Sequence, residues 1–253
     1  MKRIRLSKRD RELLIRIVPF GHATVEIIQR WYSWLSIAAV RSWIKRLRQA
    51  GWIVSAPLDE RRNYYRLSNR AVQYLRNKWG VRVSRATTRP LKPNRKPEKH
   101  AWLLFISENP TLGREAYRPA FDSGLFPELA AHLAEGKADP YRQRLFYRAG
   151  ETIGLFVLDR GHPDFVNAKL KPQVEDLWRQ PSFAKVVNAG LFELTVSTSS
   201  ISRKRELETV INEHPPGFHW QIVVMEEIAA LLPRRSSSSP PYSERSNGHE
   251  NTP

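Results

Sequence analysis

Residues 36–65 constrain the fold most tightly, because the hydrophobic period of the chain changes there from helical to β. Apolar side chains first recur every three to four residues, at Ile37, Val40, Ile44 and Leu47. This spacing predicts an amphipathic helix with one buried stripe. Ser36 stands at the expected N-cap, and Gly51 follows the last periodic residues, where a left-handed backbone favours glycine.

A β-hairpin is predicted directly after this helix. Residues 52–54 and 64–67 are short strand-like runs, and the polar, basic turn 59–63 separates them. A basic helix followed by a basic-tipped hairpin is the sequence pattern of a winged helix-turn-helix. We therefore expect such a domain here.

Further helices are predicted on both sides of this segment. Ser7 caps a periodic run that ends at Pro19, Thr24 caps a supporting helix, and Ser68 caps a helix that closes the domain near Trp79. Residues 1–80 are thus predicted to form a winged-helix DNA-binding domain.

The positive charge of the chain is concentrated in this region. Residues 1–100 contain 25 Lys and Arg against 6 Asp and Glu, whereas residues 101–253 contain 17 against 19. Positive charge concentrated in one region is expected to bind the phosphate backbone of a nucleic acid. Binding to an anionic lipid surface is the alternative. The chain has no cysteine, which excludes disulfides and thiolate metal sites.

The remaining chain changes character twice. Residues 81–99 are a basic, Pro-rich linker, interpreted either as a solvated tether or as an arm that lies along DNA. Residues 100–233 alternate strands and helices, which predicts an α/β domain with a mixed sheet and makes the whole chain α+β. Residues 234–253 are predicted to be disordered.

Individual elements of the second domain are predicted from short apolar runs. Residues 102–106 are a strand or the core of a short helix. The expected strands are 144–147, 152–158, 191–196 and 220–225, and the expected helices are 126–133, 165–178 with an interruption at Pro172, and 202–211.

No secretory signal and no apolar run long enough to span a membrane occurs in the sequence. We therefore expect a cytoplasmic protein with no membrane partner.

The recognition helix and the wing supply the candidate DNA contacts. The candidates are Ser36, Ala38, Arg41, Ser42, Lys45, Arg46, Arg48, Arg61 and Arg62. Ala38, Ser42, Lys45 and Arg46 are expected to face bases and Arg41 and Arg48 phosphates, while the wing arginines reach a minor groove or the backbone. The alternative is a charged, solvated helix face. Trp34 and Trp43 are interpreted as core or dimer contacts rather than stacking platforms.

Several motifs resemble the replication-relaxation family, which is encoded largely on plasmids and other mobile elements. They are LxxRD at 6–10, LxxAG at 47–51 and YxLS at 65–68, followed by GLFVLDRGHPDFVNAKLKPQVEDLW at 154–178 and LFELTVSTSSISRKRELETVI at 191–211. The resemblance covers roughly residues 5–80 and 140–212.

This resemblance implies that residues 100–233 form a domain similar to PD-(D/E)xK nucleases. Such a domain uses two acidic residues and a lysine to hold Mg²⁺ and activate a water molecule. The expected acidic positions fall near Arg144 and at Val157, so only Asp159 and Lys169 match. We therefore expect a catalytically inactive domain with no metal or cofactor, in which Asp159 and Arg160 form a structural ion pair or a partner contact.

These observations favour a DNA-binding regulator of a plasmid or mobile element, acting on transcription, replication or transfer. Expected partners are double-stranded DNA, a second copy of the chain, and replication or transfer proteins. One alternative is a Mg²⁺-dependent nicking enzyme whose metal site combines Asp159 with Glu151 or Asp139. A weaker alternative is an adaptor whose cations bind an acidic protein.

Overall fold

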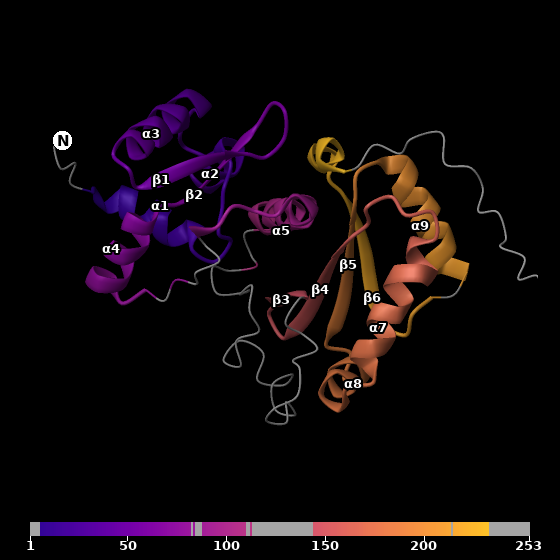
Figure 1. Ribbon diagram of the computed structural model, residues 1–253. Helices are drawn as coiled ribbons and strands as arrows, with labels where there is room; N and C mark the ends of the chain where they lie inside the picture. Colours follow the sequence, from indigo (N-terminus) through magenta and orange to yellow (C-terminus); the bar gives the residue numbers. More distant parts are fainter. Residues whose placement is uncertain are drawn as a thin grey trace, which may run out of the picture.

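The protein has a mixed α+β fold in the computed structural model, which describes residues 6–81, 83, 88–109, 112, 144–213 and 215–232. The N-terminal part contains α1 (Lys8–Ile17), α2 (Val25–Trp31), α3 (Ile37–Gln49), β1 (Ile53–Pro57), β2 (Asn63–Leu67) and α4 (Asn69–Trp79). The two strands pair antiparallel, with Ile53 opposite Leu67. Figure 1 shows α3 above the hairpin and α4 below it.

The helix starts are those predicted from the sequence. The hydroxyls of Ser7, Thr24, Ser36 and Ser68 each accept a hydrogen bond from the backbone N–H three residues later. Gly51 has a φ of 71°, as expected for the residue that ends α3.

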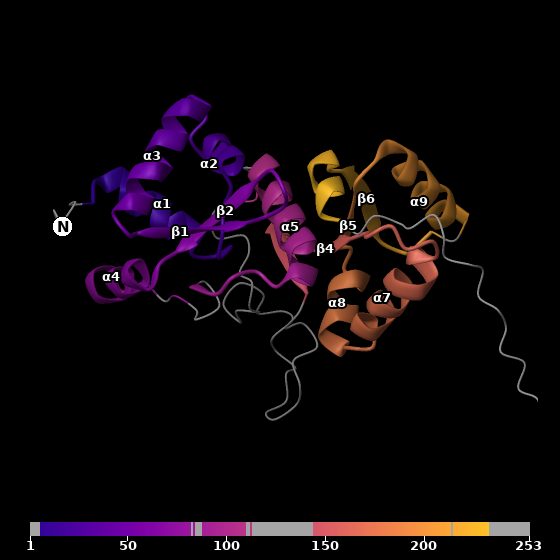
Figure 2. The ribbon, with the colours of Figure 1, turned by 45° about the horizontal axis from the view of Figure 1, so that its top comes forward.

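The helix α5 (Lys96–Glu108) lies between the N-terminal helices and the sheet (Figures 1 and 2). All its residues from His100 to Ile106 are buried, so the ambiguous run 102–106 is helical. A helix that is apolar on every side must be enclosed, and here the two parts of the protein enclose it.

The predicted solvated tether is wrong for residues 88–99. A 3₁₀ turn, η2 (Pro93–Arg95), leads into α5, the Leu91 N–H donates to the Tyr64 hydroxyl at 2.8 Å, and Lys96 Nζ donates to the Pro57 carbonyl at 2.8 Å. This segment therefore packs against the hairpin. Residues 82 and 84–87 of the predicted linker lie outside the described residues.

The second part is a four-stranded sheet in the order β3-β4-β5-β6. Its strands are β3 (Leu145–Ala149), β4 (Thr152–Leu158), β5 (Phe192–Thr198) and β6 (His219–Val224). The first pair is antiparallel and the next two pairs are parallel, which confirms the predicted mixed sheet. A short 3₁₀ helix, η4 (Glu226–Leu231), follows β6.

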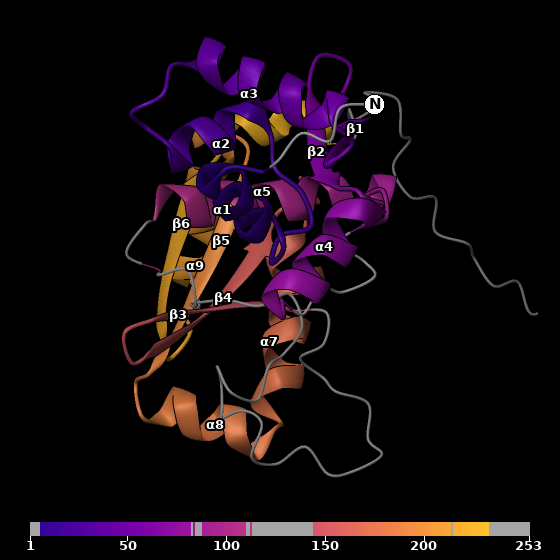
Figure 3. The same ribbon diagram turned by 90° about the vertical axis from the view of Figure 1, so that its left-hand side faces the viewer.

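Helical segments connect the parallel strands and cover the face of the sheet opposite α5 (Figure 3). They are the π-helical turn η3 (Val166–Leu170), α7 (Lys171–Trp178), α8 (Pro181–Asn188) and α9 (Ile201–Glu213). The helical backbone continues from η3 into α7, and the π-helical turn changes to an α-helix beside Pro172, where the sequence predicted an interruption. The sequence did not predict α8. The predicted helix 126–133 and the predicted disordered tail 234–253 lie outside the described residues.

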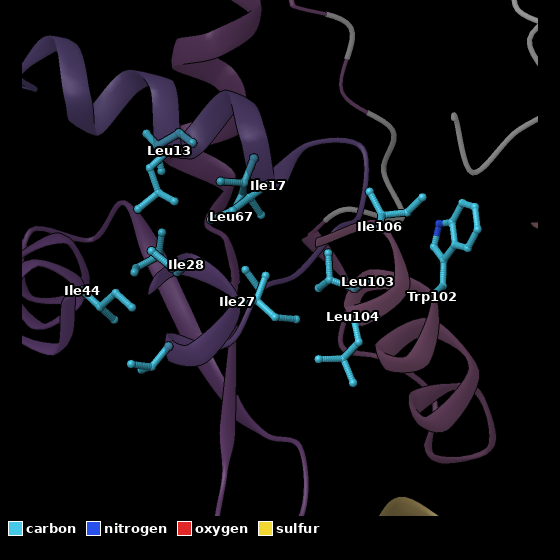
Figure 4. Close-up of a cluster of buried hydrophobic side chains, with 14 of the residues drawn as sticks. Leu13, Ile17, Ile27, Ile28, Ile44, Leu67, Trp102, Leu103, Leu104 and Ile106 are labelled. Carbon is cyan, nitrogen blue, oxygen red and sulfur yellow. The ribbon is translucent and has the colours of Figure 1, made fainter. Parts of the chain in front are cut away.

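Two hydrophobic cores lie on the two faces of this sheet. Phe156 and Leu158 of β4 point toward α5, whereas Ile153 and Leu155 point toward α7, α8 and α9. The first core continues into the N-terminal helices, as Figure 4 shows for Ile27 beside Leu103 and Leu104. The N-terminal helices and the sheet therefore share one core through α5.

A close packing contact within the sheet depends on a glycine. Tyr147 and Gly154 are register partners in β3 and β4, and the Tyr147 ring lies over the Gly154 Cα. The Tyr147 hydroxyl donates to Glu193 Oε1 at 2.6 Å and lies 2.7 Å from Thr195 Oγ1. These contacts fix the ring in place.

Replacing Gly154 with alanine should destabilise the protein by about 3 kcal/mol, because overpacking a rigid core is costly. The added Cβ would lie 2.0 Å from the Tyr147 ring. Urea unfolding measures the change. Gly217→Ala is the matched control, since no atom lies within 4 Å of its added Cβ. Equal stability of the two variants would contradict this account of the sheet.

Two buried histidines meet where the N-terminal part contacts α5. The rings of His22 and His100 lie 6.4 Å apart, and each residue is 1% exposed. His22 Nδ1 lies 3.1 Å from the Phe20 carbonyl, while His22 Nε2 and His100 Nδ1 have no hydrogen-bond partner in the described structure. Burial, assisted by Lys99, lowers the pKa of His22 to about 4. Burial, together with the charges of His22, Arg62 and Arg30 and against the opposing effect of Asp59, lowers the pKa of His100 to about 3.

Stability should therefore fall as the pH falls below about 6.5. In the unfolded chain a histidine binds a proton near pH 6.5, whereas in the folded protein His22 stays neutral until about pH 4. The contribution of the neutral histidines to the free energy of unfolding is complete above pH 6.5. At pH 5, each histidine should lower that free energy by about 2 kcal/mol. Urea unfolding at pH 7.5 and 5 measures the loss. The double variant His22→Asn, His100→Gln should lose most of this pH dependence, and an unchanged dependence would contradict the assignment.

Candidate nucleic-acid interface

The exposed surface of α3 carries most of the residues predicted to contact DNA. Side chains exposed to solvent on or beside this helix are those of Ser36, Ala38, Arg41, Ser42, Lys45 and Arg48. The opposite side is buried through Val40, Trp43, Ile44 and Leu47. Ile37 was predicted in the buried stripe but is 41% exposed, because it lies in the first turn, at the edge of that stripe.

Helical geometry sorts these side chains into a centre and two flanks. At about 100° per residue, Ala38, Ser42 and Lys45 lie opposite the buried stripe. Arg41 and Arg48 fall on one flank of this centre, and Arg46 falls on the other. The helix therefore presents small and polar side chains between two cationic edges.

Arg46 was predicted to face bases, but in the structure its side chain contacts Asp10 of α1. Its guanidinium contacts Asp10 Oδ1 on α1, and the same oxygen accepts a 2.7 Å hydrogen bond from Trp43 Nε1. Asp10 Oδ2 accepts from the Ser7 N–H at 2.8 Å. Burial raises the pKa of Asp10, but the hydrogen bonds from Arg46, Ser7 and Trp43 outweigh it and hold the pKa below its usual value. Asp10 thus ties α3 to α1 as an ionised carboxylate.

A second arginine lies beside this ion pair. The guanidinium of Arg9 stacks 4.4 Å from the Trp34 ring centre and 4.5 Å from that of Trp43. Both tryptophans were predicted to be core or dimer contacts. Trp43 is buried in the core, whereas Trp34 is 69% exposed. Sequence reasoning did not identify Arg9, because its position beside α3 depends on the packing of α1 against that helix.

The two arginines in the turn of the β1–β2 hairpin, which was predicted to be a wing, have different environments. Asp59 accepts hydrogen bonds from the backbone N–H groups of Arg61 and Arg62, at 2.9 and 2.7 Å, and so fixes the turn. The Arg61 side chain is exposed. Arg62 pairs with Asp59 at 2.6 Å and donates to the Glu227 carbonyl at 2.8 Å. The predicted contact of Arg62 with DNA therefore competes with contacts inside the protein.

Ion pairs join this part of the surface to the rest of the molecule. Arg30 of α2 bridges Glu108 Oε1 of α5 at 2.9 Å and Glu227 Oε1 of η4 at 2.6 Å. Burial raises the pKa of Glu108, and Glu227 adds to that rise against the opposing effect of Arg30. Because the Glu227 carbonyl also accepts from Arg62, η4 contacts both α2 and the β1–β2 hairpin.

The second candidate site is centred on Asp159, which follows β4 and is 1% exposed. Its Oδ2 accepts from Arg203 Nε at 2.8 Å, and its Oδ1 accepts from the Gly161 N–H at 2.9 Å. The ion-pair partner is thus Arg203 of α9 and not the expected Arg160, which pairs with Glu98 at 3.3 Å. Lys169 is exposed on η3, and no contact joins it to Asp159 among the described residues.

Neither a metal-holding cluster nor a membrane-spanning helix is found in the described residues. There, no group of three or more His, Cys, Asp or Glu side chains is arranged to hold a metal ion. Within the same ranges, no helix is both long and apolar enough to cross a membrane. The alternative metal residue Asp139 lies outside these ranges.

The chain matches no protein-family model, and searches of curated proteins and of solved structures find no match.

Replacing Asp159 with alanine should destabilise the protein by about 3 kcal/mol, because it removes a buried, paired charge. Nicking of supercoiled plasmid in Mg²⁺ should be the same for the variant and the wild type. Asp176→Ala is the control, since Asp176 pairs with Arg179 at an exposed site. Mg²⁺-dependent nicking by the wild type that is lost in Asp159→Ala would instead favour a nuclease.

Proposed function

We propose that this chain is a sequence-specific double-stranded DNA-binding protein whose N-terminal part acts as a winged helix. The observation that carries the proposal is the arrangement of α3, with Ala38, Ser42 and Lys45 between Arg41 and Arg48 on one flank and Arg46 on the other. Cationic side chains on both flanks suit a helix that lies between two phosphate backbones, and Asp10 compensates the charge of Arg46 within the protein.

The major groove of B-DNA is about 12 Å wide and admits one helix between two phosphate backbones. Contacts from the centre of the helix then read base edges, while the flanking cations position it on both strands. The order of α2, α3 and the β1–β2 hairpin also fits a winged helix, in which the helix before the recognition helix supports it.

The distribution of charge supports the same proposal. The net charge of residues 1–100 is +19, while the remaining residues are close to neutral. Phosphate neutralisation releases condensed counterions, so affinity should fall steeply as salt rises. An adaptor that binds an acidic protein would show no preference among DNA sequences.

The biological role is proposed from the resemblance to the replication-relaxation family. On that basis the protein regulates transcription, replication or transfer of a plasmid or mobile element. The sheet and its helices would then act as a nuclease-like domain in assembly, since Asp159 is occupied by Arg203. Pairing of two copies would extend a short DNA site into a longer one.

Selection from genomic and plasmid fragments in about 0.15 M salt, where nonspecific phosphate binding is weak, tests the proposal directly. Sequencing of bound fragments should show enrichment of one intact site. Uniform recovery of all fragments would contradict sequence-specific binding, and fragments that end in clustered breaks would indicate a nuclease.

The centre and the flank of α3 should contribute differently to binding. Ser42→Ala with Lys45→Ala should reduce the preference for the selected site by about 1–3 kcal/mol, because base contacts are lost. Arg41→Gln with Arg48→Gln should keep that preference but lower the slope of log K against log salt by about 2. Fluorescence anisotropy at several salt concentrations measures both quantities.

The exposed Arg179, at the end of α7, provides the control for a lost charge. Arg179→Gln should change neither the preference nor the slope. If the Ser42 and Lys45 variant lost the same affinity for every sequence, α3 would not be reading bases.

A further inference from the structure

The cluster around Arg9 is the strongest feature that the proposed function leaves unexplained. Arg9 lies on α1, and its guanidinium stacks on both Trp34 and Trp43. Its Nε is buried without a hydrogen-bond partner in the described part of the chain. Two aromatic rings thus hold an arginine in one place.

Other donors occupy the carboxylate next to Arg9. Asp10 Oδ1 accepts from Trp43 and Arg46, and Asp10 Oδ2 accepts from the Ser7 backbone. No salt bridge is formed by Arg9 within the described ranges. Arg9, Asp10 and Arg46 together therefore retain one net positive charge.

The charged cluster of Arg9, Asp10 and Arg46 lies beside α3. Arg46 lies on the flank opposite Arg41 and Arg48, and Arg9 reaches the same side through Trp43. Trp34 lies in the turn that precedes α3 and is largely exposed. The cluster thus lies at the edge of the surface proposed to enter the groove.

We propose that Arg9 and Arg46 together bind one backbone phosphate of duplex DNA, on the strand opposite the one contacted by Arg41 and Arg48. Guanidinium groups suit this role, because their fixed donors match phosphate oxygens. Trp34 is a positioning residue that holds Arg9 through its ring. The inference rests on the proposed DNA binding and adds a specific contact to it.

The structure supplies a matched control on the same helix. Arg11 also stacks on a partly exposed tryptophan, with its guanidinium 4.8 Å from the Trp79 ring centre. Its Nε is likewise buried and unpaired in the described structure. Trp79 belongs to α4, however, whereas Trp34 adjoins α3. Arg9 and Arg11 thus share their helix, charge and stacking but differ in the side they face.

The experiment compares Arg9→Gln with Arg11→Gln on the selected DNA site. Arg9→Gln should lower the salt slope by about 1 and weaken binding about fivefold to tenfold at 0.15 M salt, as expected for one lost phosphate contact. Arg11→Gln should change neither quantity. Equal slopes for Arg9→Gln and the wild type would overturn the inference, as would equal losses in both variants.

Variants of Trp34 test how it acts. Trp34→Ala should weaken binding, Trp34→Phe should restore most of the affinity, and adding Trp34→Ala to Arg9→Gln should cause no further loss. Additive losses would overturn the assigned role of Trp34. A Trp34→Ala variant that changed the sedimentation coefficient but not DNA binding would also overturn it, in favour of a protein contact.

The failure of this inference differs from that of the proposed function. If the wild type bound no DNA at low salt, both would fail. If the Arg41 and Arg48 variant lowered the salt slope while Arg9→Gln did not, DNA binding by α3 would stand and only the phosphate site would be rejected.

Discussion

The shared hydrophobic contact of α5 is the constraint on which the rest of the structure depends. All residues from His100 to Ile106 are buried. One neighbouring element can cover only one side of a helix, so α5 needs packing partners on more than one side. The N-terminal helices cover one side and β4 covers another (Figure 2). Because both surfaces are needed, the orientation of α3 relative to the sheet is tied to the packing of α5.

Buried carboxylates fix the positions of α3 and α9. Asp10 connects α1 to α3 through Arg46 and Trp43, and Asp159 connects the end of β4 to α9 through Arg203. A carboxylate removed from water is tolerated only when charges and donors compensate it. Asp159 is therefore explained by packing, whereas Asp10 also holds the Arg46 side chain against α1.

The turn of the β1–β2 hairpin contains one arginine that is held by internal contacts and one that is exposed. Arg62 donates to the Glu227 carbonyl, and Arg30 pairs with the side chain of the same residue. Any ligand that recruits Arg62 must replace that hydrogen bond and its pairing with Asp59. Arg61 is exposed, so a ligand could contact its side chain without replacing contacts of this kind. The two neighbouring arginines of the hairpin turn are therefore not equivalent.

The sequence by itself determined the local structure, because caps and periodicity act over three or four residues. Ser7, Thr24, Ser36 and Ser68 mark the helix starts, and the mixed sheet follows from alternating strands and helices. The run 102–106 stayed ambiguous, since a short apolar segment lacks a period. Only the tertiary structure decided that α5 is enclosed, that Arg46 faces Asp10, that Asp159 pairs with Arg203, and that Arg9 lies between Trp34 and Trp43. Each of these contacts joins residues far apart in the chain, and such pairings depend on how whole elements pack.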